Sequence, residues 1–407
     1  MTVSCDDIQA AARALSGAVL RTPALPAAHL AHLGAAEIVL KLECLQLTGS
    51  FKARGALYRL LALDGAECRR GVVAVSAGNH AQGVAWHARR LGIPATIVMP
   101  AGTPFSKVER TRSLGAAVVL EGDGLAEAER HALDLAASRG LTVVHPYDDP
   151  RIIAGQGTVA LELLADRPDL DLLVVPVGGG GLISGIATAA KAIKPDIEIL
   201  GVQAAACPTF VRGPRAPSSD TPRPTLAEGI AVKRPGALTR PIIDALVADV
   251  VAVEEEALEK AVEILMERQK VVAEGAGAAA LAAVLADPAR FAGRRVGLVV
   301  SGGNIDNRLM ASILMRGLVR DGRLARLRIE IADAPGGLAR AAALIAANGG
   351  NILEIVHQRL FDDVPVKSAE VDAVVETTDI DHVRAMVDAL RQAGYPTRLL
   401  GSRAAGD

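Results

Sequence analysis

Short apolar runs of Val, Ile and Leu alternate with longer Ala-rich amphipathic stretches over the first three quarters of the chain. Uninterrupted apolar runs separated by helical stretches are typical of parallel strands that are buried on both faces. The pattern predicts strand and helix pairs in this part: Val72–Val75 with His80–Leu91, Thr96–Met99 with Lys107–Leu114, Val118–Leu120 with Ala126–Arg139, and Leu172–Val177 with Leu182–Ile193. The predicted fold class is therefore α/β.

The order of the predicted elements changes after a boundary near residues 316–326. Beyond it the pattern predicts strand, helix, strand, strand, helix and strand over residues 327–332, 338–347, 351–360, 370–377, 381–393 and 396–400. This β-α-β-β-α-β order is that of a small ferredoxin-like module. We therefore predict a first domain over residues 1–320, with a Pro- and Arg-rich loop at Arg212–Pro224, and a second domain over residues 326–402.

The charge balance of the chain excludes two classes of partner. Among 407 residues, 44 Lys and Arg oppose 46 Asp and Glu, which gives a formal net charge of −2. Nucleic acid and anionic membranes are bound through clustered excess Lys and Arg, so we expect neither as a partner. The uncharged stretch Leu172–Ala190 is nearly long enough to span a bilayer, but four consecutive glycines at Gly178–Gly181 break it.

We expect the protein to be cytoplasmic. The first seven residues lack the basic region and the apolar core of a signal peptide. Four cysteines, Cys5, Cys44, Cys68 and Cys207, are too widely spaced for a zinc or redox pair and too few for a disulfide framework. We interpret them as free thiols in a reducing compartment. The spacing of the histidines does not indicate a zinc site, and we predict no metal.

The first candidate for chemistry is Lys52, in the segment Thr48-Gly-Ser-Phe-Lys-Ala-Arg-Gly-Ala56 at the start of a predicted helix. Taken alone, the segment is compatible with an ordinary solvated lysine. At a helix start, however, the positive end of the helix dipole disfavours the protonated amine. A free amine is what a lysine needs to act as a nucleophile or to form a Schiff base.

Two further segments combine small residues with the start of a helix. Ser76-Ala-Gly-Asn-His-Ala-Gln-Gly83 follows the strand Val72–Val75, at the carboxyl end where open α/β sheets bind ligands. It is either a simple turn with Asn79 as helix cap, or an anion site of backbone N–H groups with Asn79 as a directed hydrogen-bond donor. Gly178–Gly181 also lies between a strand and a helix, and a turn needs only one glycine, so we predict a phosphate site there.

The glycine patterns do not indicate ATP or a dinucleotide. Gly178–Gly181 matches neither the GxxxxGK[ST] loop nor the GxGxxG pattern. Gly275-Ala-Gly-Ala-Ala-Ala280 partly matches the second pattern, but the preceding residues Glu254–Lys270 are predicted to form a helix where that motif requires a strand. We therefore interpret this match as false.

Together, four ordered motifs resemble those of the fold-type II pyridoxal-phosphate enzymes. They are Ser50-Phe-Lys-x-Arg-Gly-Ala56, Ser76-Ala-Gly-Asn-His-Ala-Gln-Gly83, Gly178–Gly181 with Leu182, and Ser301-Gly-Gly-Asn304. Within that group the chain most nearly resembles the threonine ammonia-lyases, also called threonine dehydratases, over residues from about 5 to 316. The resemblance implies a two-lobed, tryptophan synthase beta-like catalytic domain, with a smaller lobe at about 48–140, and pyridoxal 5′-phosphate as cofactor.

The resemblance also implies a role for each motif residue. Lys52 would hold the cofactor through a Schiff base and then remove the substrate α-proton, with Phe51 packed beside the cofactor ring. Asn79 would bond the ring hydroxyl oxygen, and Ser301 would meet the pyridine nitrogen. The phosphate would be bound by Gly178, Gly179, Gly180, Gly181 and Leu182, and the substrate carboxylate by Ser76, Ala77, Gly78, Asn79 and His80. The implied reaction is deamination of L-threonine, and more slowly of L-serine, to a 2-oxo acid and ammonia.

Departures from the resemblance narrow the expected activity. In related serine racemases a serine at the position of Ala77 donates a proton on the opposite face of the substrate, so racemisation lacks that donor here. Some relatives also bind a divalent cation through a carboxylate in the segment matching Gly201–Thr209, where Gln203 and Thr209 offer only neutral oxygens. We predict no divalent cation there. A related substrate such as 3-hydroxyaspartate is an alternative, with Arg54 or another cation of the pocket accepting its second carboxylate.

The C-terminal segment Asp333-Ala-Pro-Gly-Gly-Leu338, followed by Gly350-Asn-Ile352, resembles the amino-acid-sensing ACT domain. The resemblance implies a homodimer or homotetramer, and a regulatory site for a branched-chain amino acid such as isoleucine or valine. That site would be lined by Asp333, Gly336, Leu338 and Asn351, between the first strand and the first helix of the module. One alternative is a module that serves only for dimerisation. Another is a non-catalytic sensor, against which Lys52 and the intact glycine loop argue.

Overall fold

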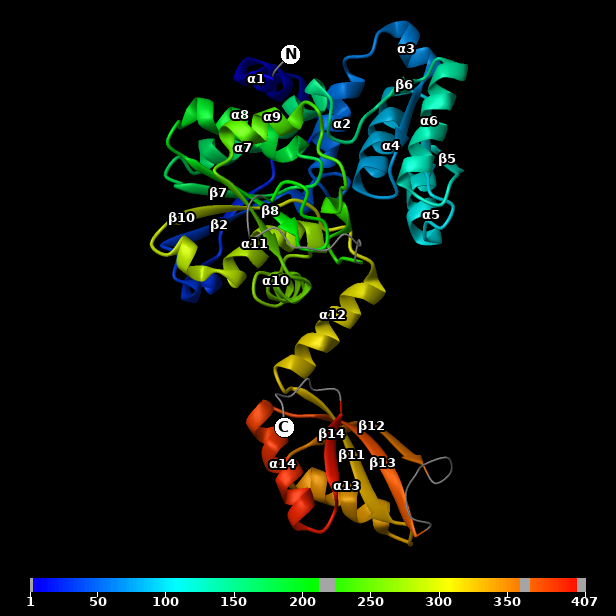
Figure 1. Cartoon of the computed structure of the whole chain (residues 1–407), viewed down its shortest axis with the longest axis vertical. Coiled ribbons are helices and arrows are strands. Elements are labelled where there is room, and N and C mark those ends of the chain that lie inside the picture. The colour runs from blue at the N-terminus through cyan, green and yellow to red at the C-terminus, as the bar shows by residue number, and fades with distance from the viewer. Residues whose placement is uncertain (1–2, 212–223, 359–366, 401–407) are drawn as a thin grey trace. The chain divides into compact units, whose positions relative to one another are not determined.

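The computed structural model describes residues 3–211, 224–358 and 367–400, and the chain divides into two compact units, Met1–Ile305 and Asp306–Asp407 (Figure 1). Apart from its last residue, the predicted loop Arg212–Pro224 lies outside the described residues, as do the last two residues of the predicted strand 351–360. Both units contain strands and helices in the order that the apolar pattern predicts. The α/β fold class is confirmed.

The first unit contains a sheet of six strands in the order β1-β2-β10-β7-β8-β9. Neighbouring strands are parallel, except that β1 and β2 are antiparallel. The strands are β1 Ala24–Pro26, β2 Glu37–Leu42, β7 Leu172–Pro176, β8 Glu198–Ala204, β9 Asp249–Val253 and β10 Arg295–Val300. The inner strands are nearly continuous apolar runs because both faces of the sheet are buried.

Helices cover both faces of this sheet, with α7, α8 and α9 on one side and α10 and α11 on the other (Figure 1). The helices of this larger lobe are α1 Cys5–Leu15, α7 Pro150–Asp166, α8 Gly181–Ile193, α9 Thr239–Leu246, α10 Glu255–Glu267 and α11 Gly275–Ala286. Side chains of α1, α7 and α8 share one hydrophobic core with the strands. Helix α11 consists only of Gly, Ala, Leu and Val and is buried almost throughout, so it has no polar face.

A smaller lobe contains a second sheet, in which four parallel strands follow the order β5-β4-β3-β6. Its elements are α2 Lys52–Leu60, α3 Gly65–Arg70, β3 Val72–Val75, α4 Asn79–Leu91, β4 Ala95–Met99, α5 Phe105–Ser113, β5 Ala117–Leu120, α6 Leu125–Arg139 and β6 Thr142–Val143. Helices α2, α4 and α5 pack on one side of the sheet and α6 on the other. The elements predicted from the pattern are confirmed to within two residues.

The second unit is a four-stranded antiparallel sheet in the order β12-β13-β11-β14, with two helices packed on it. Its elements are α12 Asn307–Arg320, β11 Leu324–Ala332, α13 Gly337–Ala347, β12 Asn351–Gln358, β13 Ser368–Glu376, α14 Ile380–Gln392 and β14 Thr397–Leu400. From β11 onward this is the predicted ferredoxin-like order. Helix α12, which the predicted boundary placed in the first domain, groups with the second unit.

Two further observations concern membrane-spanning helices and the cysteines. The helices of the described ranges are all too short or too polar to cross a membrane. Cys5, Cys44, Cys68 and Cys207 are free thiols, as predicted.

Candidate active site

Three of the four motifs meet where strands of the two sheets end. Lys52 is the first residue of α2, and the preceding Phe51 donates its backbone N–H to the carbonyl of Ser301, at 3.1 Å, just after β10. A β-bridge joins Ser50 to Gly302. Gly83 of α4 lies against the same point, because a Cβ there would come 3.2 Å from the carbonyl carbon of Lys52. The local packing therefore fixes the start of α2 between the two lobes.

The Lys52 amine contacts the residue that precedes Tyr147, and Tyr147 packs on the glycines of the third motif. Its Nζ donates a hydrogen bond to the carbonyl oxygen of Pro146, at 2.6 Å, and lies 5.2 Å from the centre of the Phe51 ring. Burial lowers the pKa of Lys52 to about 8, although the negative charge of Glu274 acts in the opposite direction. The helix start is confirmed, but burial, rather than the helix dipole that we expected, is the chief cause of the lowered pKa.

The glycine loop follows β7 and leads into α8, as predicted. Gly180 caps α8 with φ of 97°, a conformation that favours glycine. A Cβ on Gly179 would enter the ring of Tyr147, and a Cβ on Gly181 would come 2.9 Å from the Tyr147 carbonyl oxygen. The hydroxyl of Thr239 donates to the Gly179 carbonyl at 2.6 Å. The loop thus presents backbone N–H groups at a helix N-terminus, where a phosphate can bind.

The side chain of Leu182 points into the hydrophobic core, away from the predicted phosphate site. Its side chain is 5% exposed and belongs to the large hydrophobic core. Only its backbone N–H is available to a phosphate.

Asn79 is held by a hydrogen-bond network rather than acting as a helix cap. The cap of α4 is Gly78, and Asn79 is the first residue of the helix. Its Nδ2 donates to Glu274 Oε1 at 2.6 Å, and its Oδ1 accepts from Asn304 Nδ2 at 2.7 Å. This carboxamide joins the small lobe to two segments of the large lobe.

The remaining residues of the second motif form the turn from β3 to α4. The Ser76 hydroxyl accepts the N–H of Gly78 at 3.1 Å. His80 is buried, and its Nε2 donates to the Val144 carbonyl at 2.8 Å, which leaves Nδ1 unprotonated. Burial and then the charge of Lys52 lower the pKa of His80 to about 3, so the ring is neutral. Ala77 packs against the core, and its methyl side chain has no proton that it could donate.

Ser301 lies at the carboxyl end of β10. It is buried, and its hydroxyl donates to the carbonyl of Ala276 at 3.3 Å. A serine hydroxyl is neutral, so this position offers no carboxylate to a ligand.

The residues present fit pyridoxal phosphate. Lys52 is partly buried and has a lowered pKa. The four-glycine loop and the neutral hydroxyl of Ser301 follow the neighbouring strands β7 and β10. Moreover, the buried hydroxyls of Thr48 and Ser50 and the Nδ1 of His80 have no hydrogen-bond partner within the described part of the chain. Buried polar atoms are normally paired, so unpaired ones near Lys52 indicate a polar ligand.

Comparison with known proteins agrees with this geometry. The family model described as "Pyridoxal-phosphate dependent enzyme" matches residues 15–302. The chain belongs to the pyridoxal-phosphate-dependent enzymes. An L-threonine ammonia-lyase of Thermotoga maritima is 44% identical over 401 residues, which cover 98% of this chain and 100% of that protein.

Two solved structures resemble the enzyme over about three quarters of its length. A threonine deaminase from T.th. is 42% identical with a TM-score of 0.69, and the match covers 74% of this chain and 99% of that one. A maize serine racemase is 35% identical with a TM-score of 0.71, and the match covers 79% of this chain and 99% of that one.

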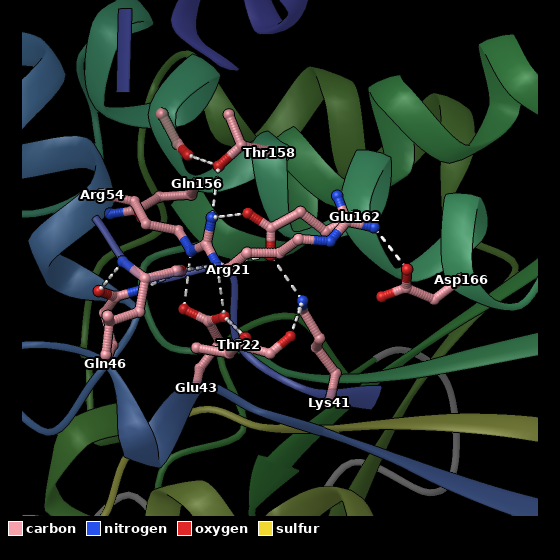
Figure 2. A network of polar contacts seen from close by, with 12 residues as sticks. Arg21, Thr22, Lys41, Glu43, Gln46, Arg54, Gln156, Thr158, Glu162 and Asp166 are labelled. Atoms are coloured by element: carbon pink, nitrogen blue, oxygen red, sulfur yellow. Dashed lines mark hydrogen bonds and ion pairs between the residues drawn. The ribbon is translucent and has the colours of Figure 1, made fainter. Parts of the chain in front are cut away.

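The structure of the enzyme contradicts the alternative role of Arg54 as a partner for a second substrate carboxylate. The Arg54 side chain is fully buried, and its guanidinium bonds Glu43 through Nε and Nη2, both at 2.8 Å. Glu162 of α7 binds the same guanidinium at 2.6 and 2.8 Å (Figure 2). Although burial acts in the opposite direction, Arg54 keeps the pKa of Glu43 below its usual value. Arg54 is therefore a structural ion-pair residue.

Gln203 and Thr209 are also occupied by internal contacts. The Gln203 Nε2 donates to the Thr209 hydroxyl at 3.1 Å, and its Oε1 accepts the backbone N–H of Phe210 at 2.7 Å. The neutral side chain closes this segment by hydrogen bonds alone. In the described ranges, no group of three or more His, Cys, Asp or Glu side chains is placed to hold a metal ion.

Sequence reasoning missed Glu274. Its carboxyl group touches Asn79, and burial raises its pKa to about 7. A signal was present in the sequence, because Glu274 is the single charged residue in the apolar stretch 271–286. Helix α10, Glu255–Glu267, precedes it where the motif requires a strand, so the dinucleotide match at Gly275 is confirmed as false.

The four predicted regulatory residues do not form one site within a single module. Asp333 follows β11, Gly336 caps α13 with φ of 82°, and Leu338 lies in α13. Asn351, however, begins β12 and pairs with Glu376, which pairs in turn with Leu324 at the start of β11. Asn351 is thus at the opposite end of the sheet, about 26 Å away for eight residues of strand.

Proposed function

We propose that the enzyme is an L-threonine ammonia-lyase, which converts L-threonine to 2-oxobutanoate and ammonia and acts more slowly on L-serine. The observation that carries the proposal is the position of Lys52, with a lowered pKa, among the glycine loop, Asn79 and Ser301. A full-length relative that is 44% identical and named L-threonine ammonia-lyase supports it.

In this reaction Lys52 binds the cofactor and then acts as general base. With a pKa of about 8, a substantial fraction of its amine is neutral near pH 7 to 8, as a nucleophile and a base require. When bound, pyridoxal phosphate supplies the electron sink that stabilises negative charge at the substrate Cα. In the turn Ser76–His80 the N–H groups of Ser76 and Gly78 are already bonded, so those of Ala77, Asn79 and His80 would bind the substrate carboxylate. Loss of the β-hydroxyl as water completes the elimination.

Two features favour elimination from a monocarboxylic substrate. Ala77 offers no second proton donor, which argues against racemisation. The guanidinium of Arg54 is already bound by two carboxylates, so it is not available to a second carboxylate of 3-hydroxyaspartate.

Comparison of kcat/KM for three substrates tests this assignment. We expect the highest value for L-threonine, a lower one for L-serine, and at least about a 100-fold loss for 3-hydroxyaspartate, because Arg54 is not available to its second carboxylate. The measurement is release of the 2-oxo acid. Equal or faster turnover of 3-hydroxyaspartate would contradict the assignment to threonine.

For the second unit we propose a regulatory ACT domain that binds a branched-chain amino acid where β11 meets α13. The left-handed Gly336 opens the 11-residue helix α13, whose first N–H groups can bind a carboxylate, beside Asp333 and Leu338. Asn351 lies too far away to belong to this site in the same module. The proposal rests on the predicted motif and on the observed ferredoxin-like order.

Removal of the second unit tests the regulatory proposal. A chain that ends at Asp321 is expected to keep activity on threonine and to lose any response to isoleucine or valine. The solved threonine deaminase that corresponds to 74% of this chain supports independent folding of the catalytic part. The measurement is the initial rate with and without each amino acid, for the full and the shortened chain. An unchanged response in the shortened chain would rule out the module as the sensor.

A further inference from the structure

Glu274 lies beside Asn79 and is placed there by two backbone features. It caps α11, and its N–H donates to the Gly302 carbonyl at 3.1 Å. A Cβ on Gly302 would come 2.5 Å from the Oε1 of Glu274, so the glycine gives the carboxyl group its room. That same Oε1 accepts the Nδ2 hydrogen of Asn79 at 2.6 Å.

Asn304 holds the other end of the Asn79 carboxamide. Its Nδ2 donates to Asn79 Oδ1 and to the Thr48 carbonyl, both at 2.7 Å. The Thr48 carbonyl carries no hydrogen, so the Nδ2 of Asn304 must face it, and the second hydrogen of this group points at Asn79. A rotation of the Asn79 amide by 180° would place oxygen against oxygen at Glu274 and nitrogen against nitrogen at Asn304. The orientation of Asn79 is therefore fixed from both sides.

We propose that Glu274 is a positioning residue that, together with Asn304, fixes the carboxamide of Asn79 and leaves its second N–H for the bound cofactor. The inference rests on the proposed function, because it assigns Asn79 to the cofactor. It extends that function to a carboxyl group which lies outside the four recognised motifs and 195 residues from Asn79 in sequence.

The protonation of Glu274 should then affect the cofactor. Burial raises its pKa to about 7, while the hydrogen bond from Asn79 lowers it. The charged groups that act on it are Glu228, which raises the pKa, and Lys107 and Lys52, which lower it; the thiol of Cys44 is also near. When the carboxylate gains a proton, a charge-assisted bond becomes a neutral one of about half the strength. Cofactor affinity should therefore fall as the pH falls through about 7.

Cofactor affinity of the full chain measures this role without any substrate. Apoenzyme is titrated with pyridoxal phosphate at about pH 6 and about pH 8.5, and bound cofactor is followed by absorbance. In Glu274→Ala we expect the affinity at the higher pH to fall about 10- to 100-fold, the size of one hydrogen bond to a charged group. Glu274→Gln keeps an acceptor for Asn79, so it should bind within a few-fold of the wild type at the higher pH. Its affinity should depend less on pH than that of the wild type, because only the titration of Lys52 remains.

A control variant and the following outcomes make the test of Glu274 decisive. Glu109→Gln changes a half-exposed carboxylate of α5 that pairs with Arg112, and it should bind like the wild type. Wild-type affinity and pH dependence in Glu274→Ala, or equal weakening in Glu274→Gln, would overturn the positioning role. If Glu274→Ala does not fold by circular dichroism, the pH dependence of Glu274→Gln alone decides. Failure of the wild type to bind the cofactor would instead refute the proposed function.

Discussion

Replacement of Lys52 by alanine is expected to abolish both stable cofactor attachment and turnover. The variant loses the nucleophile and the general base together, so activity on threonine should fall by about 10⁴-fold or more. The Nζ of Lys52 lies near the Phe51 ring and bonds Pro146, and the start of its helix packs against Ser301 and Gly83 of two other motifs. The measurements are 2-oxo acid release and the absorbance of the protein after removal of free cofactor.

A matched control separates this effect from a general loss of charge. Lys260, on the exposed side of α10, lies outside the site, and Lys260→Ala should keep the colour and the activity of the wild type. Turnover of threonine by a Lys52→Ala protein that retains its cofactor colour would reject the assigned role of this lysine.

The second large effect should follow from replacement of Arg54 by methionine. Glu43 is completely buried, and Arg54 neutralises it through two 2.8 Å hydrogen bonds (Figure 2). Without the guanidinium, Glu43 and the partly buried Glu162 lose a shared cation, and Lys41 alone remains, bonded to Glu162 at 2.6 Å. Removal of one partner from a buried ion pair typically lowers the free energy of unfolding by about 3–5 kcal/mol.

Urea denaturation of the full chain measures this loss. Arg112→Met, which removes a half-exposed pair with Glu109, should change the free energy of unfolding by less than about 1 kcal/mol. The double variant Arg54→Met with Glu43→Gln should recover part of the loss, because the buried group is then neutral. A free energy within about 1 kcal/mol of the wild type for Arg54→Met alone would show that the network does not stabilise the fold.

The strands, the helices and the motif residues were predictable because their signals are local. Apolar runs marked the buried strands, and Lys52 and the glycine loop lie where a strand or turn leads into a helix. Arg54 was assigned a wrong alternative role, although helix geometry contained the correction. At about 100° per residue, two residues along α2 turn Arg54 about 200° away from Lys52, toward the other side of the helix.

The contacts of Asn79 were not predictable from local sequence. Its partners Glu274 and Asn304 lie 195 and 225 residues away, and only the packing of α4 against the ends of two distant segments brings them together. The same limit affected the regulatory site. Asp333 and Asn351 are close in sequence, but helix α13 lies between them, and the sheet places them at opposite ends.

The strand order of the larger sheet also constrains how the chain can reach its fold during synthesis. β10 is the last strand of that sheet in sequence, yet it lies between β2 and β7. Until residue 300 has left the ribosome, β1 and β2 have no strand through which to join β7, β8 and β9. Helix α11 contacts β7, β8 and β9 before β10 is made, and β10 adds its last contact with this sheet. The nascent chain therefore carries two incomplete parts of this sheet, each with an unpaired strand edge, until β10 joins them.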